Sequence, residues 1–183
     1  MNLPRLAALG LVWLTLAHRS AAVELWSDAK MPVTNGLQLW LDASRQLDAR
    51  QKLNLRPLPD GARVDCWLDA SGHHRDLSQI NLESTPQLRQ GAGVAWISFD
   101  GQNDFLAATR TGLSFSNSTL FIVAAPKSNA GFFRGLFACT ETSQNDYIRG
   151  FNVDLGPNGG GRFDHVNIEA AGAGGARNLL RSG

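Results

Sequence analysis

The stretch Trp40-Leu41-Asp42-Ala43-Ser44, which reads WLDAS, occurs again twenty-seven positions later as Trp67-Leu68-Asp69-Ala70-Ser71. Before and within each copy, apolar residues alternate with Trp, Asp and other polar residues, and this period of two predicts a half-buried β-strand. Each copy ends in Ala-Ser, which favours a turn. A third copy is absent, which excludes a solenoid of stacked repeats. The apolar faces of the two predicted strands are Leu37, Leu39 and Leu41, and Val64, Cys66 and Leu68.

Further strand-like segments follow along the chain. They are short, contain aromatic or β-branched residues, and are separated by Gly, Asn, Asp, Ser and Pro. At least seven short strands at this spacing predict an all-β protein, in which two antiparallel sheets pack as a sandwich. Residues 44–61 are predicted to be a long surface loop with one turn of helix. The later predicted strands are 93–99, 119–125, 132–139, 147–155 and 162–168.

The chain begins like an exported protein. Arg5 precedes an apolar run over residues 6–17, and Ser20-Ala21-Ala22 supplies small residues for cleavage. The run is shorter than the roughly 20 apolar residues of a membrane-spanning helix. We therefore expect a secreted, periplasmic or cell-surface protein. The expected division is a signal peptide (1–22), a linker (23–35), one sandwich domain (36–169) and a Gly-rich tail or truncated connection (170–183).

Charge excludes one class of partner. Without residues 1–22 the chain has fifteen basic and sixteen acidic residues, so its net charge is about −1. Nucleic-acid binding requires clustered Lys and Arg, and no such surplus exists.

The two cysteines, Cys66 and Cys139, leave two interpretations open. A disulfide between them would persist in an exported protein if their Cα atoms came within about 7 Å. Two small buried residues on neighbouring strands explain the sequence equally well. The chain lacks the CxxC spacing that would indicate a structural zinc site.

Four segments in order carry a resemblance to a known family. The chain resembles the laminin-G-like, concanavalin A-like jelly rolls of large secreted or surface bacterial proteins, and most closely those of planctomycete-type multidomain proteins. The resemblance covers roughly residues 36–156 and implies a binding or adhesive role rather than catalysis. The late strands of that family are not visible before Gly183, so we expect the sandwich to be incomplete at its C-terminal end. The segments are LQLWLDAS, VDCWLDASG, ISFDGQNDFL and STLFIVAAP.

The residues offer little for catalysis. Glycosidases of sandwich folds need two carboxylates about 5 to 10 Å apart, yet the glutamates of this chain, Glu24, Glu83, Glu141 and Glu169, are isolated in sequence. Asp100 with Asp104 is the nearest candidate pair. No nucleophile-elbow pattern surrounds a serine. We therefore expect a protein that is not an enzyme.

One stretch could bind calcium. Asp100, Asn103 and Asp104 offer the oxygen ligands that Ca²⁺ prefers. The same Asp-Gly and Asn-Asp residues are also what a tight turn uses for its local hydrogen bonds. Both interpretations stay open, and Ca²⁺ is the one cofactor that the sequence indicates.

The tryptophans are the candidate ligand-binding residues. Trp40 with Asp42, and Trp67 with Asp69, share a strand face, and Trp96 is a third aromatic of this kind. Sugar-binding modules stack pyranose rings on such indoles, whereas in a sandwich they also serve as packing residues. We expect a non-catalytic extracellular module that binds glycan or an extracellular protein as part of a longer chain. The alternatives are a polysaccharide-degrading enzyme of the same fold and a structural spacer or adhesion domain.

Overall fold

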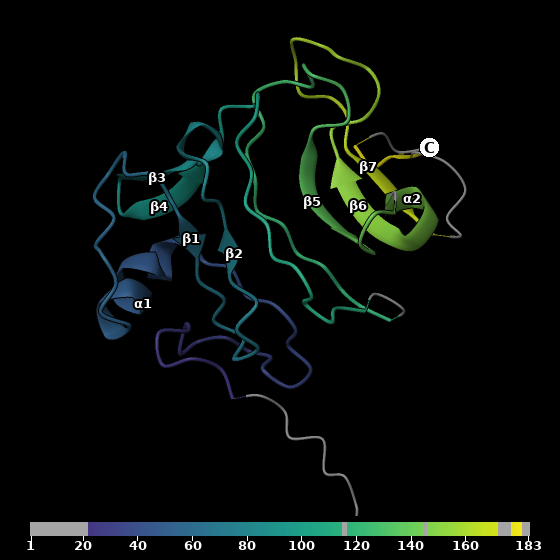
Figure 1. Cartoon of the computed structure of the whole chain (residues 1–183). Helices are drawn as coiled ribbons and strands as arrows, with labels where there is room; N and C mark the ends of the chain where they lie inside the picture. Colours follow the sequence, from purple (N-terminus) through teal and green to yellow (C-terminus); the bar gives the residue numbers. More distant parts are fainter. Residues whose placement is uncertain (1–21, 115–116, 145, 172–176, 181–183) are drawn as a thin grey trace, which may run out of the picture.

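The computed structural model describes residues 22–114, 117–144, 146–171 and 177–180. It confirms the all-β class, since most of its regular structure lies in small antiparallel sheets with little helix. Figure 1 shows an N-terminal lobe (residues 22–114) beside a C-terminal lobe (residues 127–144, 146–171 and 177–180). The sheets are β1 (Cys66–Trp67) with β2 (Leu77–Ser78), β3 (Gln87–Gly91) with β4 (Val94–Ser98), and, in the second lobe, β5 (Gly135–Thr140), β6 (Gly150–Asp154), β7 (Asn167–Ala170) and β8 (Arg177–Asn178) in that order.

The clearest hairpin is β3–β4. Gly91 pairs with Val94, and the two residues between them, Ala92 and Gly93, have φ angles of 50° and 79°. Two successive positive φ angles match the twist of a two-residue hairpin loop. The sequence predicted β4 but missed β3, because the strand QLRQG has Leu88 as its single buried residue.

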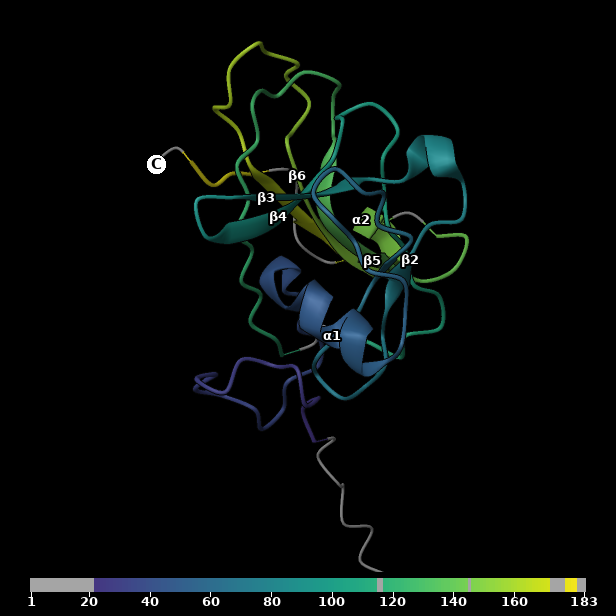
Figure 2. The ribbon, with the colours of Figure 1, turned by 90° about the vertical axis from the view of Figure 1, so that its left-hand side faces the viewer.

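A helix replaces part of the predicted surface loop. The 3₁₀ turn η1 (Ala43–Arg45) leads into α1 (Gln46–Lys52), which faces the viewer below the β3–β4 hairpin in Figure 2. Its inner face buries Gln46, Ala49 and Arg50. The predicted single turn was therefore too short, whereas residues 53–61 form the loop that the sequence predicted. The sequence understated the helix because two of the residues that anchor it are polar and do not form an apolar stripe.

Two small cores hold the N-terminal lobe together. One contains the buried Trp26, Ala49, Leu68 and Ala70, and the other contains Leu58, Val64 and Leu88. Trp26 comes from the segment 23–35 that the sequence predicted to be a linker. The Glu24 N–H also donates to the Ala70 carbonyl at 3.1 Å. This segment is therefore packed onto the lobe.

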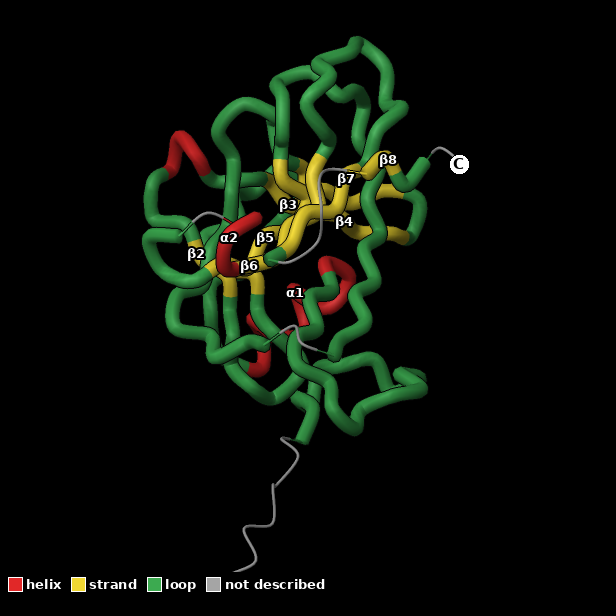
Figure 3. Tube along the Cα trace, turned by 90° about the vertical axis from the view of Figure 1, so that its right-hand side faces the viewer, coloured by secondary structure: helices red, strands yellow, loops and turns green. Residues whose placement is uncertain are grey.

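The C-terminal lobe consists of the four-stranded sheet, the short helix α2 (Asp146–Arg149) and long loops (Figure 3). α2 occupies the start of the predicted strand 147–155, and β7 begins five residues later than the predicted strand 162–168. In the predicted tail, β8 pairs with β7 through Asn178 and Arg177. Residues 172–176 and 181–183 of that tail lie outside the described residues.

Export remains a prediction from the sequence. Apart from Ala22, the predicted signal peptide lies outside the described residues. In the part of the chain that the structure describes, no helix has the length and apolarity needed to cross a membrane.

The predicted strand 119–125 is absent. These residues lie in the connection between the lobes, and no hydrogen bond joins their backbone to the described residues. Phe121 is 89% exposed and Val123 is 103% exposed. An exposed, uncharged segment with unpaired backbone groups and high β-propensity is a template for pairing between chains.

A charge in this segment should suppress self-association. We expect Val123→Lys to lower the fraction of dimers and larger species at high protein concentration, because like charges repel in an antiparallel pair. Size-exclusion chromatography with light scattering measures this. Ile80→Lys is the control, because Ile80 is 96% exposed but lies outside the segment. Equal behaviour of the two variants would contradict the prediction.

Candidate functional site

The two WLDAS copies lie against each other. Leu41 and Asp69 form an isolated antiparallel bridge, and the Ala70 N–H donates to the Trp40 carbonyl at 2.9 Å. Only Cys66 and Trp67 of the second copy's region form a strand, and the first copy forms none. The two predicted strands are therefore much shorter than expected. In this contact the Trp40 N–H donates to the Asp69 side chain and not to a backbone carbonyl.

The Asp69 carboxylate is the centre of this contact. Asp69 is 1% exposed. Its Oδ1 accepts the N–H groups of Trp40 and Ser71, each at 2.9 Å. Its Oδ2 accepts the Ser71 hydroxyl at 2.7 Å and the Arg75 N–H at 3.1 Å. A buried carboxylate is tolerated when donors satisfy it in this way, and its oxygens are engaged within the lobe.

The other residues of the repeats also have local roles. Asp42 caps η1, accepting the Ser44 N–H at 2.8 Å and the Ser44 hydroxyl at 2.6 Å. Trp40 packs against the core of Trp26 and Leu68, and Trp67 packs against the other core. Their contacts are those of packing residues. Trp96, on β4, is 46% exposed and its ring lies over Gly91.

The predicted calcium residues form a hydrogen-bonded turn. Oδ1 of Asp100 accepts the N–H groups of Gln102, Asn103 and Asp104 at 2.8, 3.1 and 3.2 Å. The Asp100 N–H donates to the Asp104 carboxylate at 2.9 Å. The Gln102 N–H, more than any other neighbour, lowers the pKa of the Asp100 carboxyl. The turn accounts for these contacts, and the described residues contain no cluster of three His, Cys, Asp or Glu side chains that could hold a metal.

Both cysteines are free thiols in the structure. Cys66 lies in β1 and Cys139 in β5, so they belong to different sheets. Burial, followed by the carboxylates of Asp76 and Asp65, raises the pKa of Cys66 to about 11. Burial also raises the pKa of Cys139.

A pocket that the sequence did not predict lies in the C-terminal lobe. The "aromatic hollow" is an open depression of about 340 Å³, lined by Phe132, Pro157, Asn158, Gly159, Gly160, Asp164 and His165. Six of its members lie within residues 157–165, and Phe132 comes from a separate loop. In the sequence, residues 156–161 are turn residues of the kind that separate the predicted strands, and His165 lies in the predicted strand 162–168. No pattern in the sequence placed Phe132 beside residues 157–165.

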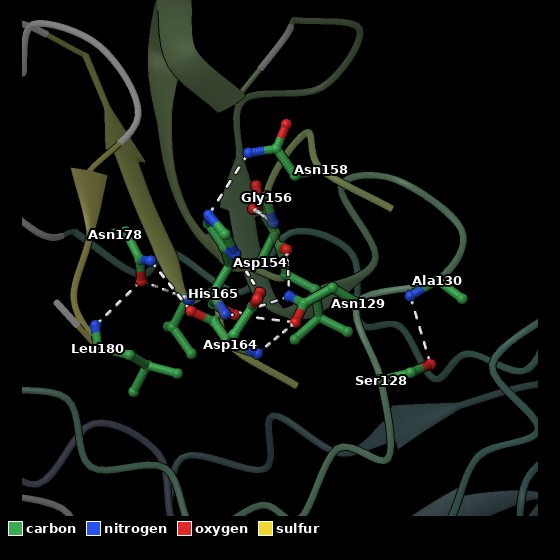
Figure 4. Close-up of polar contacts among 12 residues, drawn as sticks. Ser128, Asn129, Ala130, Asp154, Gly156, Asn158, Asp164, His165, Asn178 and Leu180 are labelled. Carbon is green, nitrogen blue, oxygen red and sulfur yellow. Dashed lines mark hydrogen bonds and ion pairs between the residues drawn. The ribbon is translucent and has the colours of Figure 1, made fainter. Parts of the chain in front are cut away.

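Asn129 holds the loops of the aromatic hollow together, as Figure 4 shows. Its side chain is fully buried. Its Nδ2 donates to the carbonyls of Leu155 at 2.5 Å and His165 at 2.9 Å, and its Oδ1 accepts the Asp164 N–H at 2.7 Å. Because these bonds reach residues on both sides of loop 156–164, one amide side chain fixes its two ends.

The polar wall of the hollow is a short hydrogen-bonded chain. The Nδ1 atom of His165 pairs with the Asp164 carboxylate, and its Nε2 lies 3.4 Å from the Asn158 amide nitrogen. These partners fit the tautomer in which Nδ1–H donates and Nε2 accepts. The His165 side chain is 13% exposed, whereas that of Asp164 is 56% exposed. Asp164 can therefore accept hydrogen bonds from a ligand.

The aromatic wall presents an exposed ring in a constrained backbone. Phe132 is 64% exposed, and its ring lies against Gly159. Phe132 and Phe133 have φ angles of 50° and 45°, and the Phe133 N–H donates to the Gly156 carbonyl at 2.8 Å. Such φ angles cost about 1–3 kcal/mol at a residue other than glycine and cluster at ligand sites. The ring and the polar groups can contact one ligand together.

Comparisons of the chain with protein-family models, with curated proteins and with solved structures give no match.

The two aspartates of the repeat should differ in importance. We expect Asp69→Ala to lower the free energy of unfolding by about 3 kcal/mol, because it leaves buried donors unpaired. Asp42→Ala, the matched change in the other copy, should cost about 1 kcal/mol, as loss of a helix cap does. Urea unfolding followed by tryptophan fluorescence measures both. Equal costs would contradict the central role of Asp69.

Thiol labelling should be slow. With a pKa of about 11, roughly one Cys66 thiol in a thousand is ionised at pH 8, and the thiolate is the reactive form. We expect alkylation of Cys66 by iodoacetamide to be roughly a hundredfold slower than that of an unperturbed thiol, and to accelerate about tenfold per pH unit. Peptide mass spectrometry measures it at each cysteine. A rate already constant at pH 8 would contradict the raised pKa.

Proposed function

We propose that this protein is a non-catalytic extracellular recognition module that binds glycan in the aromatic hollow. The observation that carries the proposal is the exposed Phe132 ring beside Asn158, Asp164 and His165. An aromatic face packs against the C–H face of a pyranose ring, while amide and carboxylate groups bind its hydroxyls. A volume of about 340 Å³ falls within the range of small-molecule sites.

The chemistry of the hollow favours binding over bond cleavage. Asp164 is the single carboxylate among the residues that line it. Glycoside hydrolysis of the common kind needs a second carboxylate about 5 to 10 Å away. Asp100 and Asp104, the candidate pair from the sequence, lie in one turn, and the carboxylate of each accepts the backbone N–H of the other. A polysaccharide-degrading enzyme of the same fold remains the alternative to a binding module.

The proposed setting comes from the sequence. The signal-like N-terminus supports export, and the laminin-G-like segments support a two-sheet, concanavalin A-like sandwich and a place in a longer secreted or surface protein. The all-β sheets are compatible with this architecture. Fold alone does not identify a ligand, so the proposal depends on the hollow.

Removing the exposed ring should weaken glycan binding. We expect at least one neutral polysaccharide to retard the full chain in affinity electrophoresis, and Phe132→Ala to weaken this binding roughly thirtyfold, which corresponds to about 2 kcal/mol for a central aromatic contact. Phe121→Ala is the matched control, because Phe121 is also exposed but lies outside the hollow.

Two results would count against the proposal. One is a wild-type chain that no polysaccharide in a broad panel retards. The other is equal weakening by Phe132→Ala and Phe121→Ala, which would indicate non-specific adhesion. Release of reducing ends from a retarded polysaccharide would favour the enzyme instead.

A further inference from the structure

A second hollow lies in the N-terminal lobe and plays no part in the proposed glycan site. The "basic hollow" encloses about 380 Å³ between residues 73–78 and residues 107–111. Phe, Tyr and Trp are absent from its lining, which consists mainly of His, Arg, Asp, Ser and Thr. It therefore offers no ring on which a sugar could stack, and its ligand must be polar.

The two walls of the basic hollow are tied together at both ends. Ser78 and Ala107 exchange backbone hydrogen bonds of 2.8 and 3.0 Å. At the other end, Nε of Arg75 donates to the Thr111 carbonyl at 2.7 Å. The segment 108–110 between these ties makes no backbone hydrogen bond to the described residues. The hollow is therefore preformed, and one wall has free N–H and C=O groups.

Two arginines give the hollow a positive charge. The Arg75 guanidinium bonds to the carbonyls of Thr111 and Gln38 and to the Gln38 side chain, all of which are neutral acceptors. Arg110 is exposed, and its side chain has no hydrogen bond or ion pair with the described residues. Asp76, the acidic residue of the lining, accepts the Asp69 N–H at 2.8 Å.

The histidines of the lining are already engaged. His74 Nδ1 lies 3.3 Å from the Glu24 carboxylate, and His73 Nε2 lies 3.1 Å from the Leu37 carbonyl. Arg110 is therefore the free cation of the hollow as far as the described residues go. His74 on one wall and Arg110 on the other have φ angles of 54° and 57°. Such backbone conformations at residues other than glycine concentrate at ligand sites.

We propose that the basic hollow binds the C-terminal carboxylate of a peptide from an extracellular partner protein. The Arg110 guanidinium can hold a carboxylate through two parallel N–H···O bonds. The free backbone groups of 108–110 can pair with the last amides of the peptide, as in other sites that capture chain ends. The volume fits a chain end rather than a long segment.

A matched pair of probes tests this proposal. A pool of acetylated tetrapeptides of random sequence is prepared with free C-terminal carboxylates, and the same pool is prepared as C-terminal amides. Binding to the full chain is measured by the shift in melting temperature and by titration calorimetry. We expect the carboxylate pool to bind and to raise the melting temperature, and the amide pool to bind at least tenfold more weakly.

Variants at Arg110 test whether the peptides bind in the basic hollow. Arg110→Gln should weaken binding of the carboxylate pool at least tenfold, and Arg110→Lys should retain part of it. Arg110→Gly is a second variant that removes the side chain without straining the backbone, because glycine adopts a φ of 57° readily. Arg56→Gln removes the same charge from an exposed residue outside the hollow, and it should leave binding unchanged.

Several outcomes would overturn the proposal. Equal binding of the two pools, or equal loss in Arg110→Gln and Arg56→Gln, would show that the terminal carboxylate is not recognised here. Binding of dextran sulfate that depends on Arg110, with no peptide binding, would replace the peptide by an anionic polysaccharide. The Phe132→Ala variant should bind the peptides normally, so the failure of the glycan proposal would not affect this one.

Discussion

The buried Asp69 carboxylate is the interaction on which the N-terminal lobe depends. It accepts N–H groups from Trp40, Ser71 and Arg75 and the Ser71 hydroxyl, and so joins three parts of the chain at one point. Water would otherwise solvate this charge, and burying it is tolerable only with all these donors in place. The contact aligns the two WLDAS copies antiparallel. The Arg75 N–H that bonds to Asp69 belongs to a residue that lines the basic hollow.

The same device recurs with other polar side chains. Gln46 of α1 exchanges two hydrogen bonds with the backbone of Leu68, at 3.1 and 3.3 Å, and so takes the place of a neighbouring strand. Arg50 binds the Asp65 carboxylate at 2.9 Å. In the C-terminal lobe, Asn129 satisfies four backbone groups. Buried side-chain amides and charges thus connect loops where the sheets are too short to do so.

Both proposed sites lie where such loops are fixed. The aromatic hollow is built on Asn129, and the basic hollow on the Ser78–Ala107 bridge and the Arg75–Thr111 bond. Each contains a residue with positive φ that is not glycine and whose side chain is exposed, Phe132 in one and Arg110 in the other. A rigid frame lowers the cost of ordering an exposed residue when a ligand binds, and strained residues concentrate at such sites.

Sequence alone determined the all-β class and β4, because alternation and turn residues act locally along the chain. It could not decide whether each tryptophan and aspartate packs within the fold or faces a ligand. Asp69 and Asp42 have identical neighbours in the sequence, yet Asp69 is buried between the two copies and Asp42 caps the turn η1. Only the tertiary structure placed Phe132 and Asp164 in one hollow and His74 and Arg110 in the other. Both arrangements depend on long-range hydrogen bonds by Asn129 and Arg75. Local sequence does not determine which distant group a polar side chain will bond to.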